Sequence, residues 1–383
     1  MDVRSSLALP AARFVYGMPR RDRWRESFLA TPIQLNPSHF RGMGSGSSQA
    51  RTTARFVCGM LSQGKGKGDR LLVTAIWSIL SLSDGQRIVS GSFDCTVRVW
   101  NAATGAMERT FTGHTASINS VAFSSDGQRI ISGSFDGTIR MWNATTGALE
   151  GSPFTGHTDS VNSVSFSKDG QQIVSGSDDR TICIWNTTTG ALEREPFMGH
   201  TDSVCFVAFS LDGHRIVSGS SDSAIRVWNA MTGALEGRWF TGHTNSVNSV
   251  AFSQDGERII SGSFDRTLRV SNVMTGTLEE TPFTGHSSAV NSVAFSQDGQ
   301  RIVSGSYDGM IRVWNAITGA MEGSPFIGHT HSVRFVIFLP DGQRIASGSN
   351  DYTIRVWNTA TGNNGRRSVC WPHKFCQFSR NVA

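Results

Sequence analysis

A single internal repeat of fixed length dominates this sequence of 383 residues. A Gly-His pair recurs six times at intervals of one 43-residue period, first at Gly113 and last at His329. A Trp-Asn pair follows in each copy except one, where Ser271 replaces the Trp. One further copy precedes these, with Leu71 and Leu72 in place of Gly-His, so the chain holds seven units. A period of this length indicates an array of similar structural units that bury their apolar faces against one another.

Each unit has the pattern of four short strands joined by turns. In the unit that starts at Gly113, apolar residues alternate along short stretches, and Asp-Gly and Thr-Gly pairs separate these stretches. We predict strands over Ile118–Phe123 (with one irregular step), Arg129–Ser134, Thr138–Trp142 and Ala148–Phe154. Four short strands in about 40–45 residues, with a Gly-His pair and a Trp dipeptide, are typical of one blade of a propeller.

With these motifs, residues 71–371 resemble the WD-repeat (WD40) β-propeller family. The resemblance implies an all-β fold: a seven-bladed β-propeller of four-stranded antiparallel blades, with largely disordered N- and C-terminal tails. Asn follows each Trp where the family usually has Asp, but that position lies outside the hydrogen-bonded set described below. The near-identical copies, with stretches such as GHTDSVNSV and DGQRIVSGS, are also similar to the propellers of fungal STAND/NACHT-type WD-repeat proteins.

The charge is unevenly distributed and separates the chain into three parts. Residues 1–70 form a basic, Gly/Ser/Arg-rich arm with 12 Lys and Arg against 4 Asp and Glu, which we expect to be mostly disordered. Residues 71–371 form the predicted propeller, and residues 372–383 a C-terminal tail. Because residues 71–362 hold 19 basic and 26 acidic side chains, the formal net charge of +5 does not indicate a ring that binds nucleic acid.

A propeller closes when one end of the chain supplies the last outer strand. Lys65–Arg70 is in register for this role but is rich in Gly and Lys. Arg366–Trp371 is also in register and follows the Thr361-Gly362 turn. We therefore predict that the C-terminal segment closes the ring, with the N-terminal segment as the alternative.

A His, a Ser, an Asp and a Trp recur together in the units. Ser, His and Asp could form a hydrolytic triad, but an enzyme needs one such set, and here six occur at fixed spacing. The family resemblance instead implies a hydrogen-bond network inside each blade. In that network the Asp orients the imidazole, the imidazole meets the Ser hydroxyl, and the indole N–H finds a buried acceptor.

The network residues are complete in five units and altered in two. The complete sets are His114, Ser132, Asp136, Trp142; His157, Ser175, Asp179, Trp185; His200, Ser218, Asp222, Trp228; His286, Ser304, Asp308, Trp314; and His329, Ser347, Asp351, Trp357. The fifth unit has His243, Ser261 and Asp265, with Ser271 for the Trp. The first has Ser90, Asp94 and Trp100, with Leu72 for the His.

A few positions differ strongly from unit to unit. In the family, the residue five after the His and the residue before the network Asp point to the top face, around the channel mouth; the residue after the Asp varies as well. We call these positions the rim: Trp77, Phe93, Asn119, Phe135, Asn162, Asp178, Arg180, Cys205, Ser221, Asn248, Phe264, Arg266, Asn291, Tyr307, Arg334, Asn350 and Tyr352. Aromatic and Arg side chains are typical interface anchors, so we predict a ligand-binding rim with aromatic residues in units 1, 2, 5 and 6. Neutral drift at exposed loops is the alternative.

Other motifs point away from cofactors, metals and membranes. Gln63–Asp69 lacks the spacing of a phosphate-binding loop. Cys370, His373 and Cys376 form a cluster without an evident fourth zinc ligand, so we predict no metal site. No apolar run approaches the roughly 18 residues of a membrane span. The six cysteines form no Cys-x-x-Cys pair, which fits a reducing compartment, so we expect a cytoplasmic protein, with the nucleus as the alternative.

These observations predict a non-catalytic protein-protein interaction platform that binds a protein or peptide ligand on its top face. We expect no cofactor, no small-molecule substrate and no nucleic acid as partner, and either a monomer or a subunit of a larger complex. The fungal resemblance implies the ligand-sensing module of a NACHT-type system. A constitutive scaffold or adaptor subunit, as in a ubiquitin ligase or a chromatin assembly, is the alternative. An enzyme would need a unique cluster of ionisable residues in the channel, and no unit shows one.

Overall fold

The computed structural model describes residues 76–81, 86–237, 240–360 and 364–370, with no helix among them. Only the backbone is described at residues 76–81, 279–281 and 364–370. The chain divides into a unit of residues 1–48 and a unit of residues 49–383, and every described residue belongs to the second. The predicted arm over residues 1–70 and tail over residues 372–383 lie outside the described residues.

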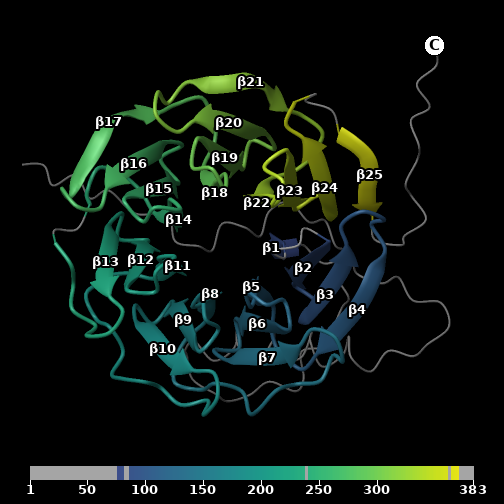
Figure 1. The fold of residues 1–383 in the computed structure, drawn as a ribbon, viewed down its shortest axis with the longest axis vertical. Coiled ribbons are helices and arrows are strands. Elements are labelled where there is room, and N and C mark those ends of the chain that lie inside the picture. Colours follow the sequence, from purple (N-terminus) through teal and green to yellow (C-terminus); the bar gives the residue numbers. More distant parts are fainter. Residues whose placement is uncertain (1–75, 82–85, 238–239, 361–363, 371–383) are drawn as a thin grey trace, which may run out of the picture. The chain divides into compact units, whose positions relative to one another are not determined.

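The described residues form seven antiparallel sheets that follow one another around a ring (Figure 1). The inner strands are β1 (Ile76–Ser81), β5 (Ile118–Phe123), β8 (Val161–Phe166), β11 (Val204–Phe209), β14 (Val247–Phe252), β18 (Val290–Phe295) and β22 (Val333–Phe338). The second strands are β2 (Arg87–Ser92), β6 (Arg129–Ser134), β9 (Gln172–Ser177), β12 (Arg215–Ser220), β15 (Arg258–Ser263), β19 (Arg301–Ser306) and β23 (Arg344–Ser349).

Two further sets of strands complete the sheets. The third strands are β3 (Thr96–Asn101), β7 (Ile139–Asn143), β10 (Ile182–Asn186), β13 (Ile225–Asn229), β16 (Leu268–Asn272), β20 (Ile311–Asn315) and β24 (Thr353–Asn358). The outer strands are β4 (Met107–Thr112), β17 (Thr277–Phe283), β21 (Met321–Phe326) and β25 (Asn364–Cys370). We number the sheets as blades 1 to 7 in chain order and include in each blade the outer segment that follows its third strand.

Blade 2 shows how the sequence sets each sheet. The strands β5 and β6 match the predicted strands at both ends, and β7 begins one residue later than predicted. The irregular step in the first strand is a register shift between Ile118 and Ser120, and the same shift recurs in the other inner strands. At the Asp-Gly turn, Gly127 has a φ of 68°, which glycine adopts without steric cost. The strand and turn pattern of the sequence is thus confirmed for the three inner strands.

Within the described residues, however, the outer strand forms in four of the seven blades. In blades 2, 3 and 4 the outer segment makes two isolated bridges to the third strand, so no strand spans Ala148–Phe154, contrary to the prediction. From the network Trp to the outer Phe these segments carry one residue more than in blade 1. Blades 5 and 6 carry the same additional residue, and Pro282 and Pro325 stand where blade 2 has Pro153, so neither feature by itself ends the ladder. In blades 5 and 6 the outer strand persists across a register shift.

The C-terminal segment supplies the last outer strand, as predicted. The strand β25 pairs antiparallel with β24 and begins two residues before the predicted segment Arg366–Trp371. On the other side of blade 7, β22 and β23 contact β1. Ile88 and Trp100 of blade 1 pack with Leu339 of blade 7 in one buried cluster. The ring therefore closes between the first blade and the last.

The hydrophobic core lies between neighbouring blades. Five of the buried clusters combine the outer and third strands of one blade with the inner strands and the Trp of the next. For example, the ring of Phe111 in blade 1 lies 5.7 Å from the ring of Trp142 in blade 2. Because deletion of a buried Trp costs about 3–5 kcal/mol, these contacts hold the blades together. Among the described residues, no helix has the length and apolarity needed to cross a membrane.

Candidate functional site on the top face

One face of the ring carries all the positions predicted for the site. In every blade the second strand ends beside the start of the first, because the two run antiparallel. In blade 2, the Phe135 N–H donates to the Ser117 carbonyl at 2.9 Å. The turn from the second to the third strand lies at the same end. We call the face with these seven turns the top face, and the opposite face, with the turns that precede the second and follow the third strands, the bottom face.

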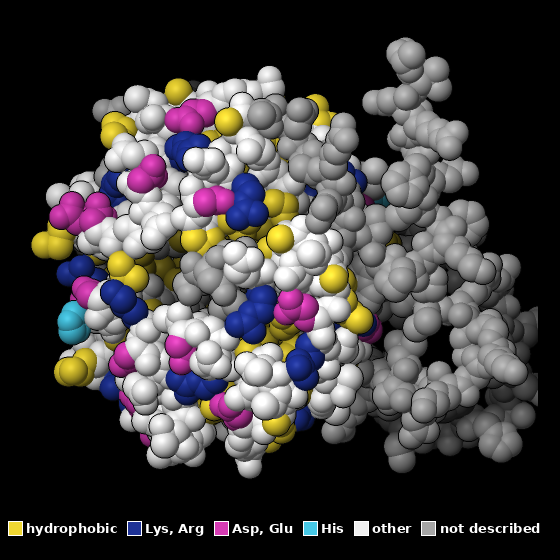
Figure 2. Space-filling view, turned by 45° about the vertical axis from the view of Figure 1, so that its right-hand side comes forward, with side chains coloured by type: hydrophobic (Ala, Val, Ile, Leu, Met, Phe, Trp, Pro, Cys, Tyr) yellow, Lys and Arg dark blue, Asp and Glu magenta, His cyan; other side chains and the backbone are white. Residues whose placement is uncertain are grey.

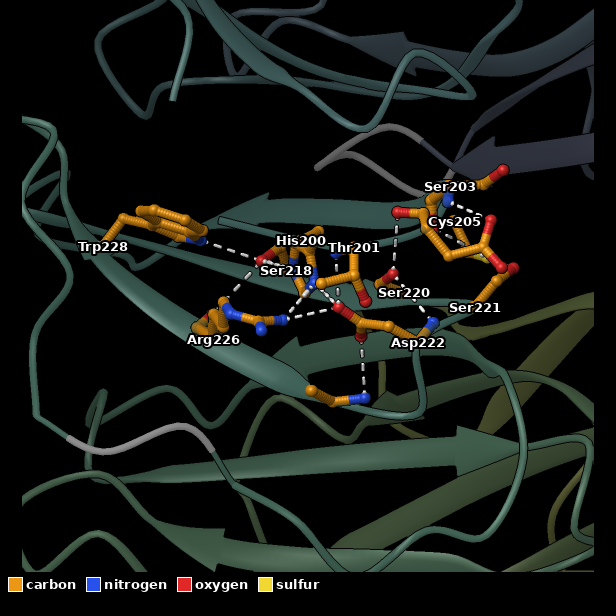
Figure 3. A network of polar contacts seen from close by, with 12 residues as sticks. His200, Thr201, Ser203, Cys205, Ser218, Ser220, Ser221, Asp222, Arg226 and Trp228 are labelled. Atoms are coloured by element: carbon orange, nitrogen blue, oxygen red, sulfur yellow. Dashed lines mark hydrogen bonds and ion pairs between the residues drawn. The ribbon is translucent and has the colours of Figure 1, made fainter. Parts of the chain in front are cut away.

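The four recurring network side chains meet inside each blade near the top face. His Nδ1 lies 2.8–2.9 Å from Asp Oδ2 in the six blades that have the His. His Nε2 lies 2.7–2.8 Å from Ser Oγ. Trp Nε1 donates to the same Oγ at 2.7–3.0 Å in the six blades that have the Trp. In blade 4, Ser218 lies between His200 and Trp228 (Figure 3).

The geometry assigns the protons of the network. An ionised Asp only accepts, so His Nδ1 carries the proton and His Nε2 accepts. The Ser hydroxyl therefore donates to Nε2 while it accepts from the indole. The His side chains are only 0–2% exposed. Because these atoms are buried and already paired, the arrangement fits a structural tie and not a hydrolytic triad.

The electrostatics agree with this proton assignment. Burial by itself raises the pKa of the network Asp, but the hydrogen bond and charge of the His, together with further donors, bring it below its usual range in blades 2–7. The pKa of Asp308 falls to about 2. Burial lowers the pKa of His200 and His286, and the adjacent Arg226 and Arg312 lower it further, against the opposing effect of the Asp. At neutral pH the carboxylates are charged and these two imidazoles are neutral.

An arginine of the third strand supplies a donor where the network lacks one. In five blades a Thr two residues after the Asp donates to Asp Oδ1 at 2.6–2.7 Å. Blades 4 and 6 have Ala and Met there, and Arg226 and Arg312 donate to Asp Oδ2 at 2.8 and 3.1 Å instead. Blade 1 lacks the network His, and Arg98 Nη2 donates to Asp94 at 2.6 Å. Sequence analysis missed this role, although loss of the Thr or His in a unit is its signal.

Blade 5 lacks the Trp and leaves a polar atom unpaired. The side chain of Ser271 is buried, and its Oγ has no hydrogen-bond partner among the described residues. Ser261 keeps its 2.8 Å contact with His243 but receives no indole N–H. A buried hydroxyl without a partner costs about 1–3 kcal/mol, so the network of blade 5 is the weakest of those with a His.

Four asparagines of the rim tie neighbouring blades together. Their Nδ2 groups donate to a valine carbonyl of the next blade, always 42 residues on. The pairs are Asn119–Val161 at 3.1 Å, Asn162–Val204 at 3.1 Å, Asn248–Val290 at 2.9 Å and Asn291–Val333 at 2.7 Å. These residues therefore hold the ring together. Their recurrence in four of the seven units is the sequence signal for that role.

The same position carries other residues in blades 1, 4 and 7. Cys205 Sγ lies 3.3 Å from Ser221 Oγ. Arg334 reaches from blade 7 to blade 6, where its Nη1 donates to the Tyr307 hydroxyl at 2.8 Å. Its Nε donates to Asn350 Oδ1 at 3.1 Å, and its guanidinium carbon lies 4.9 Å from the centre of the Tyr307 ring. The remaining residue, Trp77, lies in β1, where only the backbone is described.

The residue after the network Asp has the same unusual backbone in all seven blades. Its φ is 67–74° at Cys95, Arg180, Ser223, Arg266 and Tyr352, and 78–79° at Gly137 and Gly309. In each turn this left-handed residue closes a three-residue hairpin loop. A residue other than glycine in this region costs about 1–2 kcal/mol. Five blades thus keep a side chain at this turn of the top face, although its backbone conformation favours glycine. Such retained strain is typical of functional positions.

Aromatic side chains are exposed on adjoining blades of the top face. The rings of Phe264 in blade 5 and Tyr307 in blade 6 lie 5.7 Å apart, and Arg334 of blade 7 stacks on Tyr307. Phe264, Phe93 of blade 1 and Phe135 of blade 2 are 43%, 45% and 47% exposed. Because blade 7 adjoins blade 1, these side chains span five consecutive blades. We call Phe264, Tyr307, Arg334, Phe93 and Phe135 the aromatic arc.

Blades 3 and 4 interrupt the arc with polar residues. Asp178 and Ser221 stand where blades 1, 2, 5 and 6 have the aromatic residue, and both are half-buried. Asp178 accepts from Asn162 at 2.8 Å. Of the remaining rim positions, Arg180 and Arg266 are exposed and Tyr352 is half-buried. The top face thus has an aromatic part and a polar part.

A family model described as WD domain, G-beta repeat matches seven stretches that together cover more than half of the chain. The matched residues are 71–101, 105–143, 149–186, 192–229, 236–271, 276–315 and 322–358. The last six stretches begin in or beside the outer segment of one blade and end in the third strand of the next, so each repeat is shared by two blades. No curated protein sequence matches the chain.

Proposed function

Because the chain belongs to the WD40 repeat family, we propose that it is a non-catalytic platform that binds a protein or peptide ligand on its top face. The observation that carries the proposal is the aromatic arc over blades 5, 6, 7, 1 and 2, in which the phenylalanines of blades 5, 1 and 2 are 43–47% exposed. Soluble proteins seldom expose contiguous apolar side chains without a partner, and aromatic residues with Arg are the usual anchors of protein interfaces.

Two features favour recognition over neutral drift at these positions. The backbone strain after the network Asp is retained at five blades, although a glycine would relieve it. The aromatic residues also adjoin one another around the ring, including the stacked set on blades 5–7. The network residues beneath them supply a rigid support, because their polar atoms are buried and paired. A rigid scaffold with varied turns is a common way to build a binding surface.

Two finer roles fit this platform. The near-identical copies and the varied rim support a ligand-sensing module of a NACHT-type system. Exposed apolar residues on the bottom face favour the second candidate, a constitutive scaffold or adaptor. Met231, Met274 and Ile317, at the turn after the third strand of blades 4, 5 and 6, are 74%, 72% and 71% exposed. The other blades have Ala or Thr at this position, so a second surface is present on three adjoining blades.

Affinity capture with the whole protein tests the proposal. The arc variant carries Phe135→Ala, Phe264→Ala and Tyr307→Ala, and the matched variant carries Met231→Ala, Met274→Ala and Ile317→Ala on the bottom face. We expect the arc variant to lose partners that the bottom-face variant keeps, with both variants folded by circular dichroism. Equal recovery of all partners by the wild type and the arc variant would overturn the top-face proposal. Partners lost only by the bottom-face variant would favour the scaffold role.

A further inference from the structure

We propose that the ligand of the aromatic arc is an acidic peptide segment, in which Asp or Glu side chains stand next to aromatic or aliphatic ones, bound over blades 5–7. This inference rests on the proposed function and names the chemistry of its partner. It follows from the distribution of charge around the top face, from the fixed position of Arg334, and from the packing of the two rings beside it.

The charge of the top face differs between its two parts. The top-face turns and network positions of blades 5–7 hold five arginines (Arg266, Arg269, Arg312, Arg334 and Arg355) against the three network aspartates. Blades 3 and 4 hold two arginines (Arg180 and Arg226) against five aspartates (Asp159, Asp178, Asp179, Asp202 and Asp222). Elsewhere the surface mixes basic and acidic side chains, as Figure 2 shows on one side of the molecule. The aromatic part is therefore the electropositive part, and it complements an acidic partner.

Arg334 is held in one orientation before any ligand arrives. Its hydrogen bonds to Tyr307 and Asn350 come from two different nitrogens, and the guanidinium lies 4.9 Å from the centre of the tyrosine ring. These three contacts fix the plane of the group across blades 6 and 7. A guanidinium that is already ordered loses less side-chain freedom on binding a carboxylate than a mobile lysine does. Arg334 is thus suited to a planar anion such as a carboxylate.

The rings next to Arg334 favour a ligand that carries an apolar side chain beside its carboxylate. Phe264 and Tyr307 are tilted by 55° with their centres 5.7 Å apart, and Phe264 is 43% exposed. This pair presents apolar ring area directly beside the cation. The binding free energy is most favourable when an apolar side chain of the partner covers the rings and a neighbouring carboxylate pairs with the guanidinium. The apolar group then excludes water from the ion pair.

Single-stranded nucleic acid also combines negative charge with stacking groups, but it fits less well. Binding to a phosphate backbone needs a row of cations that follows the strand. Here three of the five arginines on blades 5–7 lie on the third strand, and Arg312 donates to the network Asp308. The five aspartates of blades 3 and 4 would repel a strand that continues around the ring. Nucleic acid is therefore kept as an outcome of the test.

The test selects binders from a randomised peptide library displayed on phage, with the whole protein as bait. Three baits run in parallel: the wild type, Arg334→Gln, and Lys168→Gln, which removes one exposed cation on the bottom face. We expect the wild type and Lys168→Gln to enrich peptides with Asp or Glu next to an aromatic or aliphatic residue. Synthetic copies of these peptides should bind Arg334→Gln about ten-fold more weakly, which is typical for loss of one interface anchor.

Arg334→Lys separates charge from geometry, because it keeps the cation and loses the planar stack. We expect its affinity to lie near that of Arg334→Gln. Enrichment of basic or uncharged peptides by the wild type overturns the inference, as does tighter binding of a labelled oligouridine than of the selected peptides. Failure to enrich any peptide overturns it as well. If capture in the previous section still depends on the arc after such a result, the proposed function stands and only the acidic chemistry fails.

Discussion

Leu278 of blade 5 lies over Gly242, where other blades place a tryptophan ring over the equivalent glycine. A Cβ built on Gly242 would lie 2.5 Å from Leu278 Cδ1, whereas one built on Gly285 meets the ring of Trp314 at 3.1 Å. Leu278 is half-buried, while the leucines at this position in blades 2, 3 and 4 are 37–41% exposed. The leucine thus fills part of the space that the missing indole leaves, and Ser271 Oγ finds no hydrogen-bond partner in the described part of the chain.

Restoration of the tryptophan should stabilise the protein. Ser271→Trp regains an indole donor for Ser261 and displaces Leu278 outward, so we expect the free energy of unfolding to rise by about 1–3 kcal/mol. This is less than the full cost of a lost Trp because the leucine already fills part of the site. Urea denaturation measures the change, and Ser271→Ala is the control, with a gain of at most about 1 kcal/mol. A lower midpoint for Ser271→Trp would contradict the blade register.

Relief of the left-handed backbone should also stabilise the protein. Ser223 has a φ of 67°, so Ser223→Gly should raise the free energy of unfolding by about 0.5–1 kcal/mol, after allowance for the greater freedom of glycine in the unfolded chain. The reverse change, Gly137→Ser, should lower it by a similar amount. Thermal or urea denaturation of the two variants gives opposite shifts if the turn has this conformation. Shifts of the same sign would show that contacts of the side chain outweigh the backbone.

The asparagines and the aromatic residues of the rim should respond differently to substitution. Asn291→Ala removes the 2.7 Å bond to the Val333 carbonyl, and we expect a loss of about 1–2 kcal/mol of stability. Phe135→Ala removes an exposed ring, which should change stability by less than about 0.5 kcal/mol. Urea midpoints measure both. A stability loss for Phe135→Ala equal to that for Asn291→Ala would assign the ring to the fold and weaken its place in the binding arc.

Stability should fall as the pH is lowered, in two stages. The pKa of His200 and His286 is lower in the folded protein, so the unfolded chain takes up protons first, and stability declines as the pH falls below about 6.5. The network aspartates also have a lowered pKa, about 2 for Asp308, and their contribution is lost as the pH falls from about 4 toward that value. Urea midpoints at pH 7.5, 5.5 and 3.5 measure both stages.

Two variants sharpen the pH experiment. Arg226→Met removes one cause of the lowered pKa of His200, so the decline between pH 7.5 and 5.5 should become smaller, although burial remains the main cause. His331→Gln changes an exposed histidine and should leave the profile as it is. A midpoint that rises on acidification to pH 5.5 would be incompatible with the lowered pKa of His200 and His286.

The period of the sequence was sufficient to predict the blades, the inner three strands and the closing strand. Strand patterns repeat because each blade packs against the same kind of neighbour, so local sequence and tertiary contact agree. The outer strand was less predictable. Blades 2–6 all carry one more residue than blade 1 before the outer Phe, yet blades 2–4 lose the ladder while blades 5 and 6 keep it through a register shift.

The rim positions could be located from the sequence, but the sequence did not show which of them join neighbouring blades and which are exposed. Asn119 and Phe135 both stood at variable positions, yet one donates across to blade 3 and the other is exposed. Arg98 pairs with Asp94 in a unit that has Leu72 in place of the network histidine, and that position is distant from Arg98 in the sequence. The stack of Arg334 on Tyr307 joins two blades, so the residue pattern within one unit does not predict it.

The joints between blades recur at constant offsets. A rim Asn donates to a carbonyl 42 residues on, and in blades 2, 3, 5 and 6 an inner-strand Ser hydroxyl accepts from a backbone N–H 44 residues on. Each of these four units therefore offers nearly the same coupling to the unit that follows it. Recombination between near-identical copies could duplicate, delete or exchange whole units without breaking these couplings. The residues of the arc would be carried with their units, so the recognition surface could be reassorted in 43-residue cassettes as well as by single substitutions.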